Sequence, residues 1–147
     1  MERDTYNSVK ELCSNRDFDK AFLLLKQIAE EGDSEAMFEL AVMYEFVYTN
    51  SEKAVEWYEK AVYAGFAKAM YNLGLLYEFA EDFDKAKDWY EKAAKTLNSG
   101  AMLKLGMIYK NSKDFQKARE WLEKAFELGN ADAAFIIANM YEDGDIY

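Results

Sequence analysis

The side chains of this sequence that could do chemistry are mainly carboxylates, because aspartate and glutamate supply 28 of its 147 residues and histidine is absent. Without histidine, a Ser-His-Asp triad, a Cys-His pair and most zinc sites cannot be assembled. Two carboxylates could perform acid–base catalysis, but no motif places such a pair in an apolar pocket. The acidic tail YEDGD (141–145) lacks the ligand spacing of an EF-hand, and no phosphate-binding loop or dinucleotide fingerprint is present. We therefore expect a protein that is not an enzyme and has no metal site or cofactor.

Cys13 is the single cysteine, which excludes an internal disulfide and fits a reducing compartment. We interpret it as a free structural thiol in a helix. The opening MERDTYNSVK has no apolar segment of a secretory signal, and no apolar run approaches the ~18 residues of a membrane span. The sequence therefore predicts a cytoplasmic protein that does not enter a membrane.

The interaction that remains possible is apolar contact. As a helix, the run AMYNLGLLYEF (69–79) would present apolar side chains on two of its sides. One stripe contains Ala69, Leu73, Leu76 and Tyr77. A second stripe, about a quarter turn or more away, contains Tyr71, Leu75 and Phe79. A surface helix of a soluble domain needs one apolar face, so the second stripe predicts a further contact.

The elements that position these residues are repeated. The segments AMFELAVMY, AMYNLGLLY, AMLKLGMIY and AAFIIANMY begin at Ala36, Ala69, Ala101 and Ala133. A second block, WYEKA, begins at Trp57 and Trp89 and returns as WLEKA at Trp121, and DFDKAFLLLKQIA (17–29) repeats it in weaker form. Helical patterning with a period of about 32 residues is typical of a solenoid of stacked helix pairs.

Each block has a distinct packing role. In the first, which we name helix A, the small residues Ala41, Gly74, Gly106 and Ala138 share one register and predict close approach of a neighbouring helix. In the second, helix B, an apolar stripe such as Ala54, Trp57, Tyr58 and Ala61 predicts close interdigitation. Gly32, Gly65 and Gly129 follow helix B where a C-terminal cap belongs, whereas one unit has Leu97 there.

These patterns predict an all-α chain that forms one helical-repeat domain over residues 1–147. It begins with a degenerate pair over 3–31, made of a polar helix (3–13) and a B helix (17–31). Three A/B pairs follow at 34–64, 67–96 and 99–128, and a lone A helix closes the chain at 131–143.

The motif A-x-x-x-L-G-x-x-Y, followed by K-A-x-x-W-Y-x-K-A-A, resembles the Sel-one-like repeat, a relative of the tetratricopeptide repeat. The resemblance covers residues 17–147 and is clearest over 69–94. It implies an α-solenoid of stacked antiparallel helix pairs in a right-handed superhelix, and a protein-binding scaffold without catalysis. The chain departs from the family between Tyr77 and Ala86, where it has the shorter tetratricopeptide spacing instead of a Gly-x-Gly loop.

In this architecture the second stripe would line a concave, aromatic-rich groove with an acidic margin. The groove residues that we predict are Tyr6, Phe38, Val42, Glu45, Phe46, Tyr71, Leu75, Glu78, Phe79, Leu103, Met107 and Phe135. The middle of the stripe should then contribute most to binding, whereas Phe46 and Phe79, near the helix ends, should be the least buried. The alternative is that these side chains pack one A helix against the next and form core.

The net charge of −10 disfavours nucleic acid and anionic membrane surfaces as partners. We expect a protein partner, a peptide or helix that is apolar and carries basic residues. The alternative function is that of a small acidic immunity or inhibitor protein that blocks a basic active site.

The last A helix has no B helix after it and carries Ile136 where earlier units have Glu39, Asn72 and Lys104. Terminal repeats need polar caps. We therefore expect Ile136, together with Ile146 and Tyr147, to contact a second copy of the chain or the partner. The alternative is that the short tail folds back over this edge.

Overall fold

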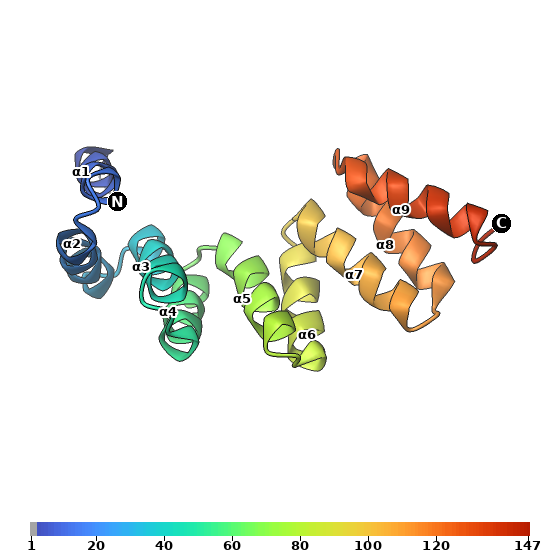
Figure 1. Cartoon of the computed structure of the whole chain (residues 1–147), viewed down its shortest axis with the longest axis horizontal. Helices are drawn as coiled ribbons and strands as arrows, with labels where there is room; N and C mark the ends of the chain where they lie inside the picture. The colour runs from blue at the N-terminus through green and yellow to red at the C-terminus, as the bar shows by residue number, and fades with distance from the viewer. Residues whose placement is uncertain (1–2) are drawn as a thin grey trace. The chain divides into compact units, whose positions relative to one another are not determined.

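A computed structural model describes residues 3–147, and these residues form nine α-helices and no strand (Figure 1). The helices are α1 (Arg3–Ser14), α2 (Phe18–Glu30), α3 (Ser34–Phe46), α4 (Ser51–Tyr63), α5 (Lys68–Phe79), α6 (Phe83–Ala94), α7 (Ser99–Asn111), α8 (Phe115–Glu127) and α9 (Ala131–Glu142). Helices α3, α5, α7 and α9 are the A helices, and α2, α4, α6 and α8 are the B helices. The prediction of an all-α helical-repeat fold is confirmed.

The helices group into two compact units, and the boundary between Leu76 and Tyr77 falls inside α5. In the first unit α2 packs against α1 and α3, and α3 packs against α4. In the second unit α7 packs against α6 and α8, and α8 packs against α9. A single domain over residues 1–147 stays a prediction.

The core of each unit is built from the small and large residues that the repeat predicts. In α4 the four stripe residues Ala54, Trp57, Tyr58 and Ala61 are all buried. The tryptophans of α6 and α8 are half-buried, and the ammonium groups of Lys92 and Lys124 lie over their rings, 4.1 and 4.6 Å from the ring centroids. A lysine stem can cover apolar surface while its charged end reaches water, so this edge of helix B stays soluble.

The helix ends follow the predicted capping pattern. Gly32, Gly65 and Gly129 follow B helices and adopt φ of 101°, 95° and 87°, a region that glycine enters without steric cost. Leu97 takes the same role after α6 with φ of 61°, although an L side chain is disfavoured there. The C-cap prediction is confirmed, including the exception.

The C-terminal tail folds back on its own chain. Ile146 is buried, its amide donates to the carbonyl oxygen of Met140 at 3.3 Å, and Arg119 Nη1 donates to the carbonyl oxygen of Tyr147 at 3.3 Å. The expectation that Ile146 contacts another chain is therefore wrong, because its side chain is already buried within its own chain. Ile136 is half-buried, and its contact with a second copy or a partner stays a prediction.

Across residues 3–147, every helix falls short of the length and apolar character that crossing a membrane requires.

Candidate functional site

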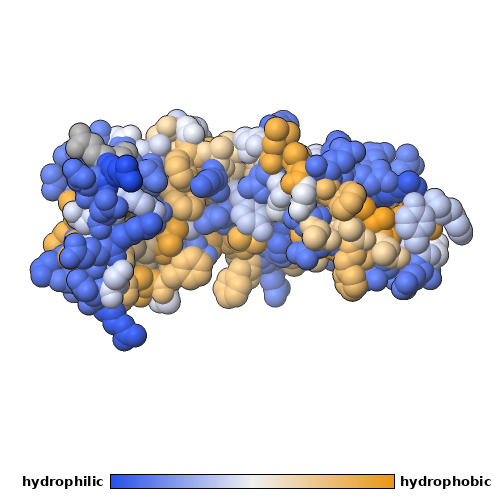
Figure 2. Space-filling view, turned by 90° about the horizontal axis from the view of Figure 1, so that it is seen from above, coloured by the Kyte–Doolittle hydropathy of each residue, from blue (hydrophilic) through white to orange (hydrophobic). Residues whose placement is uncertain are grey.

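Large apolar side chains reach the surface of both units. On the face drawn in Figure 2 they lie among hydrophilic side chains. Of the predicted groove residues, Phe46 and Phe79 are the most exposed, with 70% and 88% of their surface accessible, and Phe135 and Met107 follow with 69% and 39%. The prediction that Phe46 and Phe79 are the least buried is confirmed. Each ends an A helix, Phe46 in the first unit and Phe79 in the second.

The middle of the predicted stripe is half-buried. The ring of Phe38 packs against Tyr58 and Phe66, with centroids 5.5 and 4.9 Å apart. The half-buried residues of the predicted set are Tyr6, Phe38, Val42, Glu45, Tyr71, Leu75, Glu78 and Leu103. Part of each stripe therefore contributes to packing, as the alternative interpretation expected, and the part that is open to a partner lies toward the helix ends.

The predicted acidic margin is engaged by the chain itself. Glu45 accepts a hydrogen bond of 2.8 Å from the hydroxyl of Tyr58, a fully buried residue of α4. The Tyr58 hydroxyl in turn accepts a bond of 3.0 Å from the side-chain amide of Asn72. Burial, followed by the bond to Glu45, raises the pKa of Tyr58, so the hydroxyl stays protonated and donates.

Glu78 repeats this arrangement in the second unit. It accepts a hydrogen bond from the hydroxyl of Tyr90, which is fully buried, and forms an ion pair of 3.0 Å with Lys104. Glu45 thus links α3 to α4, and Glu78 links α5 to α6. Both carboxylates therefore accept hydrogen bonds within the chain, in addition to any role at the margin of a binding site.

The next A/B pair, α7 and α8, lacks both members of this bond. Lys110 stands where Glu45 and Glu78 stand, and Leu122 stands where Tyr58 and Tyr90 stand. A buried leucine needs no acceptor, so the carboxylate has no structural task there. The joint change was visible in the sequence and is the signal that could have revealed the tyrosine–carboxylate bond.

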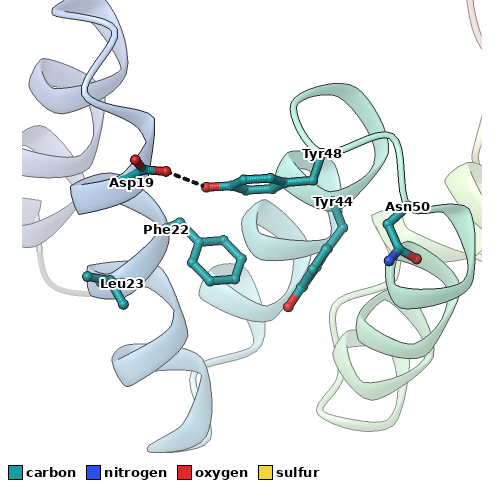
Figure 3. A pocket seen from close by; sticks show the side chains of 6 residues that line it. All are labelled: Asp19, Phe22, Leu23, Tyr44, Tyr48 and Asn50. Carbon is teal, nitrogen blue, oxygen red and sulfur yellow. Dashed lines mark hydrogen bonds between the residues drawn. The ribbon is translucent and has the colours of Figure 1, made fainter.

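A pocket that was not predicted lies in the first unit between α2, α3 and the loop after α3 (Figure 3). It encloses about 490 Å³ and is lined by Asp19, Phe22, Leu23, Tyr44, Tyr48 and Asn50. The ring of Phe22 lies nearly perpendicular to Tyr44 and Tyr48, with centroids 5.3 and 5.1 Å apart. The Tyr48 hydroxyl donates to Asp19 Oδ1 at 3.2 Å. We call this the aromatic pocket.

Cys13 is half-buried in α1. Burial and the nearby Glu39 carboxylate raise the pKa of its thiol, which lowers the fraction present as the reactive thiolate. This environment agrees with a structural thiol.

Glu39 of α3 supplies a prediction about pH. Burial raises the pKa of its carboxyl, the neighbouring Glu35 adds to this, and Lys10 and Lys68 oppose it. Because the folded chain holds this proton more tightly, the contribution of Glu39 to stability is full below about pH 4 and is lost as pH rises through the folded pKa. Glu39→Gln should therefore raise the urea midpoint at pH 7, and the difference from the unchanged chain should vanish near pH 4. Glu52→Gln, at an exposed position, is the control, and an equal gain there would contradict the prediction.

Family models of helical repeats match most of the chain. The Sel1 repeat model matches residues 12–33 and 34–66, and the tetratricopeptide repeat model matches residues 67–96 and 99–132. Comparison with curated proteins finds no match.

Solved structures of bacterial repeat proteins are similar to this chain. A protective antigen present in uropathogenic Escherichia coli strains, which displays an SLR fold, is 31% identical with a TM-score of 0.74 over 85% of this chain and 29% of its own. A Sel1 repeat protein from Oxalobacter formigenes is 28% identical with a TM-score of 0.78 over 98% of this chain and 62% of its own. The chain therefore spans less than two thirds of the length of either protein. PilF of Pseudomonas aeruginosa, 20% identical with a TM-score of 0.74 over 97% of this chain and 68% of its own, shares the fold.

Sel1 and tetratricopeptide repeats are generally non-catalytic modules for protein–protein interaction. The repeated motifs, the helix pairs and the similar structures agree with one another. The chain belongs to the Sel1-like repeat proteins of the tetratricopeptide-like superfamily.

Proposed function

We propose that this protein is a binding module that holds a peptide or helix of another protein against an exposed phenylalanine at the end of an A helix. The observation that carries the proposal is the exposure of Phe46 and Phe79 at one register of successive A helices. Exposed aromatic side chains at a repeated position are typical of a docking surface, because an unpartnered ring in water contributes nothing to the fold. The net charge of −10 favours a partner segment that adds basic residues to its apolar ones.

The proposal shifts the expected anchors from the middle of the stripe to its ends. Phe38 is engaged with Tyr58 and Phe66, so its truncation would disturb packing together with any binding. Phe46 has most of its surface in water and can be truncated with little effect on the core. This difference allows binding and stability to be separated.

The test uses a peptide selected from a displayed random library on the immobilised full chain. Phe46→Ser or Phe79→Ser should weaken its binding about tenfold or more, the effect of losing an aromatic anchor, without lowering the melting temperature. Tyr63→Ser is the matched control, because Tyr63 is 91% exposed at the end of α4, outside the A helices. Titration calorimetry and thermal melts on the same samples give both quantities.

If selected peptides bind both phenylalanine variants as they bind the unchanged chain, neither Phe46 nor Phe79 anchors the partner, and the proposal fails. Because the apolar contacts are not screened and only the basic residues of the partner are, affinity should fall only modestly between low and physiological salt. A steep loss of affinity with salt would instead favour the acidic inhibitor.

A further inference from the structure

The last turn of each A helix carries a tyrosine at the same register. These residues are Tyr44, Tyr77, Tyr109 and Tyr141. At three of them the chain places a cation of its own over the ring. Lys85 lies 5.2 Å from the centroid of Tyr77, Lys87 and Lys117 lie 4.7 and 5.3 Å from that of Tyr109, and the guanidinium carbon of Arg119 lies 5.7 Å from that of Tyr141. The repeat thus pairs this tyrosine with a cation, an attraction that the negative face of an aromatic ring provides.

Tyr44 departs from this rule. Phe22 occupies the position of Lys87 and Arg119, directly after the alanine of the DFDKA-type motif. Lys53, which corresponds to Lys85, has its ammonium nitrogen 2.9 Å from Glu56. Lys53 interacts with Tyr44 electrostatically. Within residues 3–147, the cations that stack over rings do so at other positions, and the aromatic neighbours of the Tyr44 ring are Phe22 and Tyr48.

An insertion completes the aromatic pocket. The N-cap residues of α4, α6 and α8 are Asn50, Asp82 and Asp114, and the amide of each donates to the carbonyl oxygen of the tyrosine in the preceding A helix. Asn50 lies six residues after Tyr44, whereas Asp82 and Asp114 lie five residues after Tyr77 and Tyr109. The longer loop holds Thr49 at φ of 50°, an unusual conformation for a β-branched residue. It also places Tyr48 against Phe22 and Tyr44, with its hydroxyl on Asp19 (Figure 3).

We propose that the aromatic pocket binds a lysine or arginine side chain of a partner polypeptide. Phe22, Tyr44 and Tyr48 present three rings at steep mutual angles, and a cation between them meets the negative face of at least one. Asp19 supplies a carboxylate at the rim, and the net charge of −10 attracts basic segments. The partner would thus fill the place over Tyr44 that the chain's own lysine or arginine fills in later repeats. The lining of this pocket does not include Phe46 or Phe79, the anchors proposed above for apolar side chains.

The probe is the peptide acetyl-Gly-Gly-Arg-Gly-Gly-amide, followed by the aromatic nuclear magnetic resonance signals of the full chain. It should shift the signals of Phe22, Tyr44 and Tyr48 and saturate. The same peptide with citrulline, a neutral isostere of arginine, should bind at least roughly fivefold more weakly, because it lacks the charge. Equal affinity for the two peptides, or shifts confined to other rings, would overturn the proposal.

Variants connect the effect to the pocket. Asp19→Asn keeps an oxygen for the Tyr48 hydroxyl and removes the charge, so it should weaken arginine binding by roughly threefold or more. Phe22→Lys introduces the residue found as Lys87 in α6 and should abolish peptide binding by placing an internal cation over Tyr44. Gln27→Lys is the control, since it adds the same charge at an exposed site on α2 outside the pocket. Binding to both pocket variants as to the unchanged chain would overturn the proposal, and Asp19→Asn decides alone if Phe22→Lys melts early.

Discussion

A Tyr58→Ala variant is expected to lose about 3–5 kcal/mol of the free energy of unfolding, the usual cost of emptying a buried aromatic site. Tyr58 is fully buried in α4, and its ring packs against Phe38. Its hydroxyl donates to Glu45 of α3 and accepts from Asn72 of α5, so one side chain connects three helices of the first unit. Since a whole domain is stable by only about 5–15 kcal/mol, this loss is a large share of the total and should lower the urea midpoint markedly. Urea unfolding followed by far-ultraviolet circular dichroism measures the loss.

Tyr58→Phe separates the hydroxyl from the ring. It keeps the packing and leaves Glu45 and Asn72 without their shared partner, which should cost about 1–2 kcal/mol. Tyr63→Ala, at a residue of the same helix that is 91% exposed, should change stability by less than about 0.5 kcal/mol. If Tyr58→Phe were as stable as the unchanged chain, the bond to Glu45 would be incidental, and Glu45 would be available to a partner after all.

The fold was predictable because the same apolar helical pattern, which requires burial against a neighbouring helix, recurs several times in the sequence. The apolar stripe of each B helix begins with an alanine, and a tryptophan follows at the same spacing in α4, α6 and α8. A slip of one residue would expose these side chains together. One position departs from its register. Ala138 shares the register of Ala41 and Gly106 but is exposed, whereas Gly106 lies against Leu122 and Ala118 of α8.

The candidate site was less predictable, because the exposure of a side chain depends on whether a neighbouring helix packs against it, which the sequence of its own helix does not show. Phe38 and Phe46 lie on the same stripe of α3, yet Phe38 is covered by Tyr58 and Phe66, and Phe46 lies past the end of that contact. The aromatic pocket depends on residues of α2 and of a loop that lie far apart in sequence. Phe22 stands where Lys87 stands in a later repeat, and this difference acquires meaning only when the structure places the Phe22 ring against Tyr44.

The glycine of helix α7 allows two opposing effects to be compared. Gly106 is a helix-interior glycine, and replacing such a residue by alanine on an exposed face gains up to about 1 kcal/mol. Here an added Cβ would lie 2.6 Å from Leu122 Cγ, 2.7 Å from Leu122 Cδ2 and 3.3 Å from the carbonyl oxygen of Ala118. Both residues belong to α8 and are buried, so neither can give way without moving the helix. The close approach predicted from the small residue at this register is confirmed.

Gly106→Ala is therefore expected to lower the free energy of unfolding by a net amount of about 1–2 kcal/mol, because overpacking of a filled core costs about 1–3 kcal/mol and exceeds the gain in helix propensity. The same substitution in a Leu122→Ala background should reverse sign and stabilise that background by up to about 1 kcal/mol, since the obstructing side chain is gone. The coupling between the two sites, measured by urea unfolding of the four proteins, isolates the steric contact. If Gly106→Ala stabilised the unchanged chain, α7 and α8 would be free to separate, and the glycine would not be required for their packing.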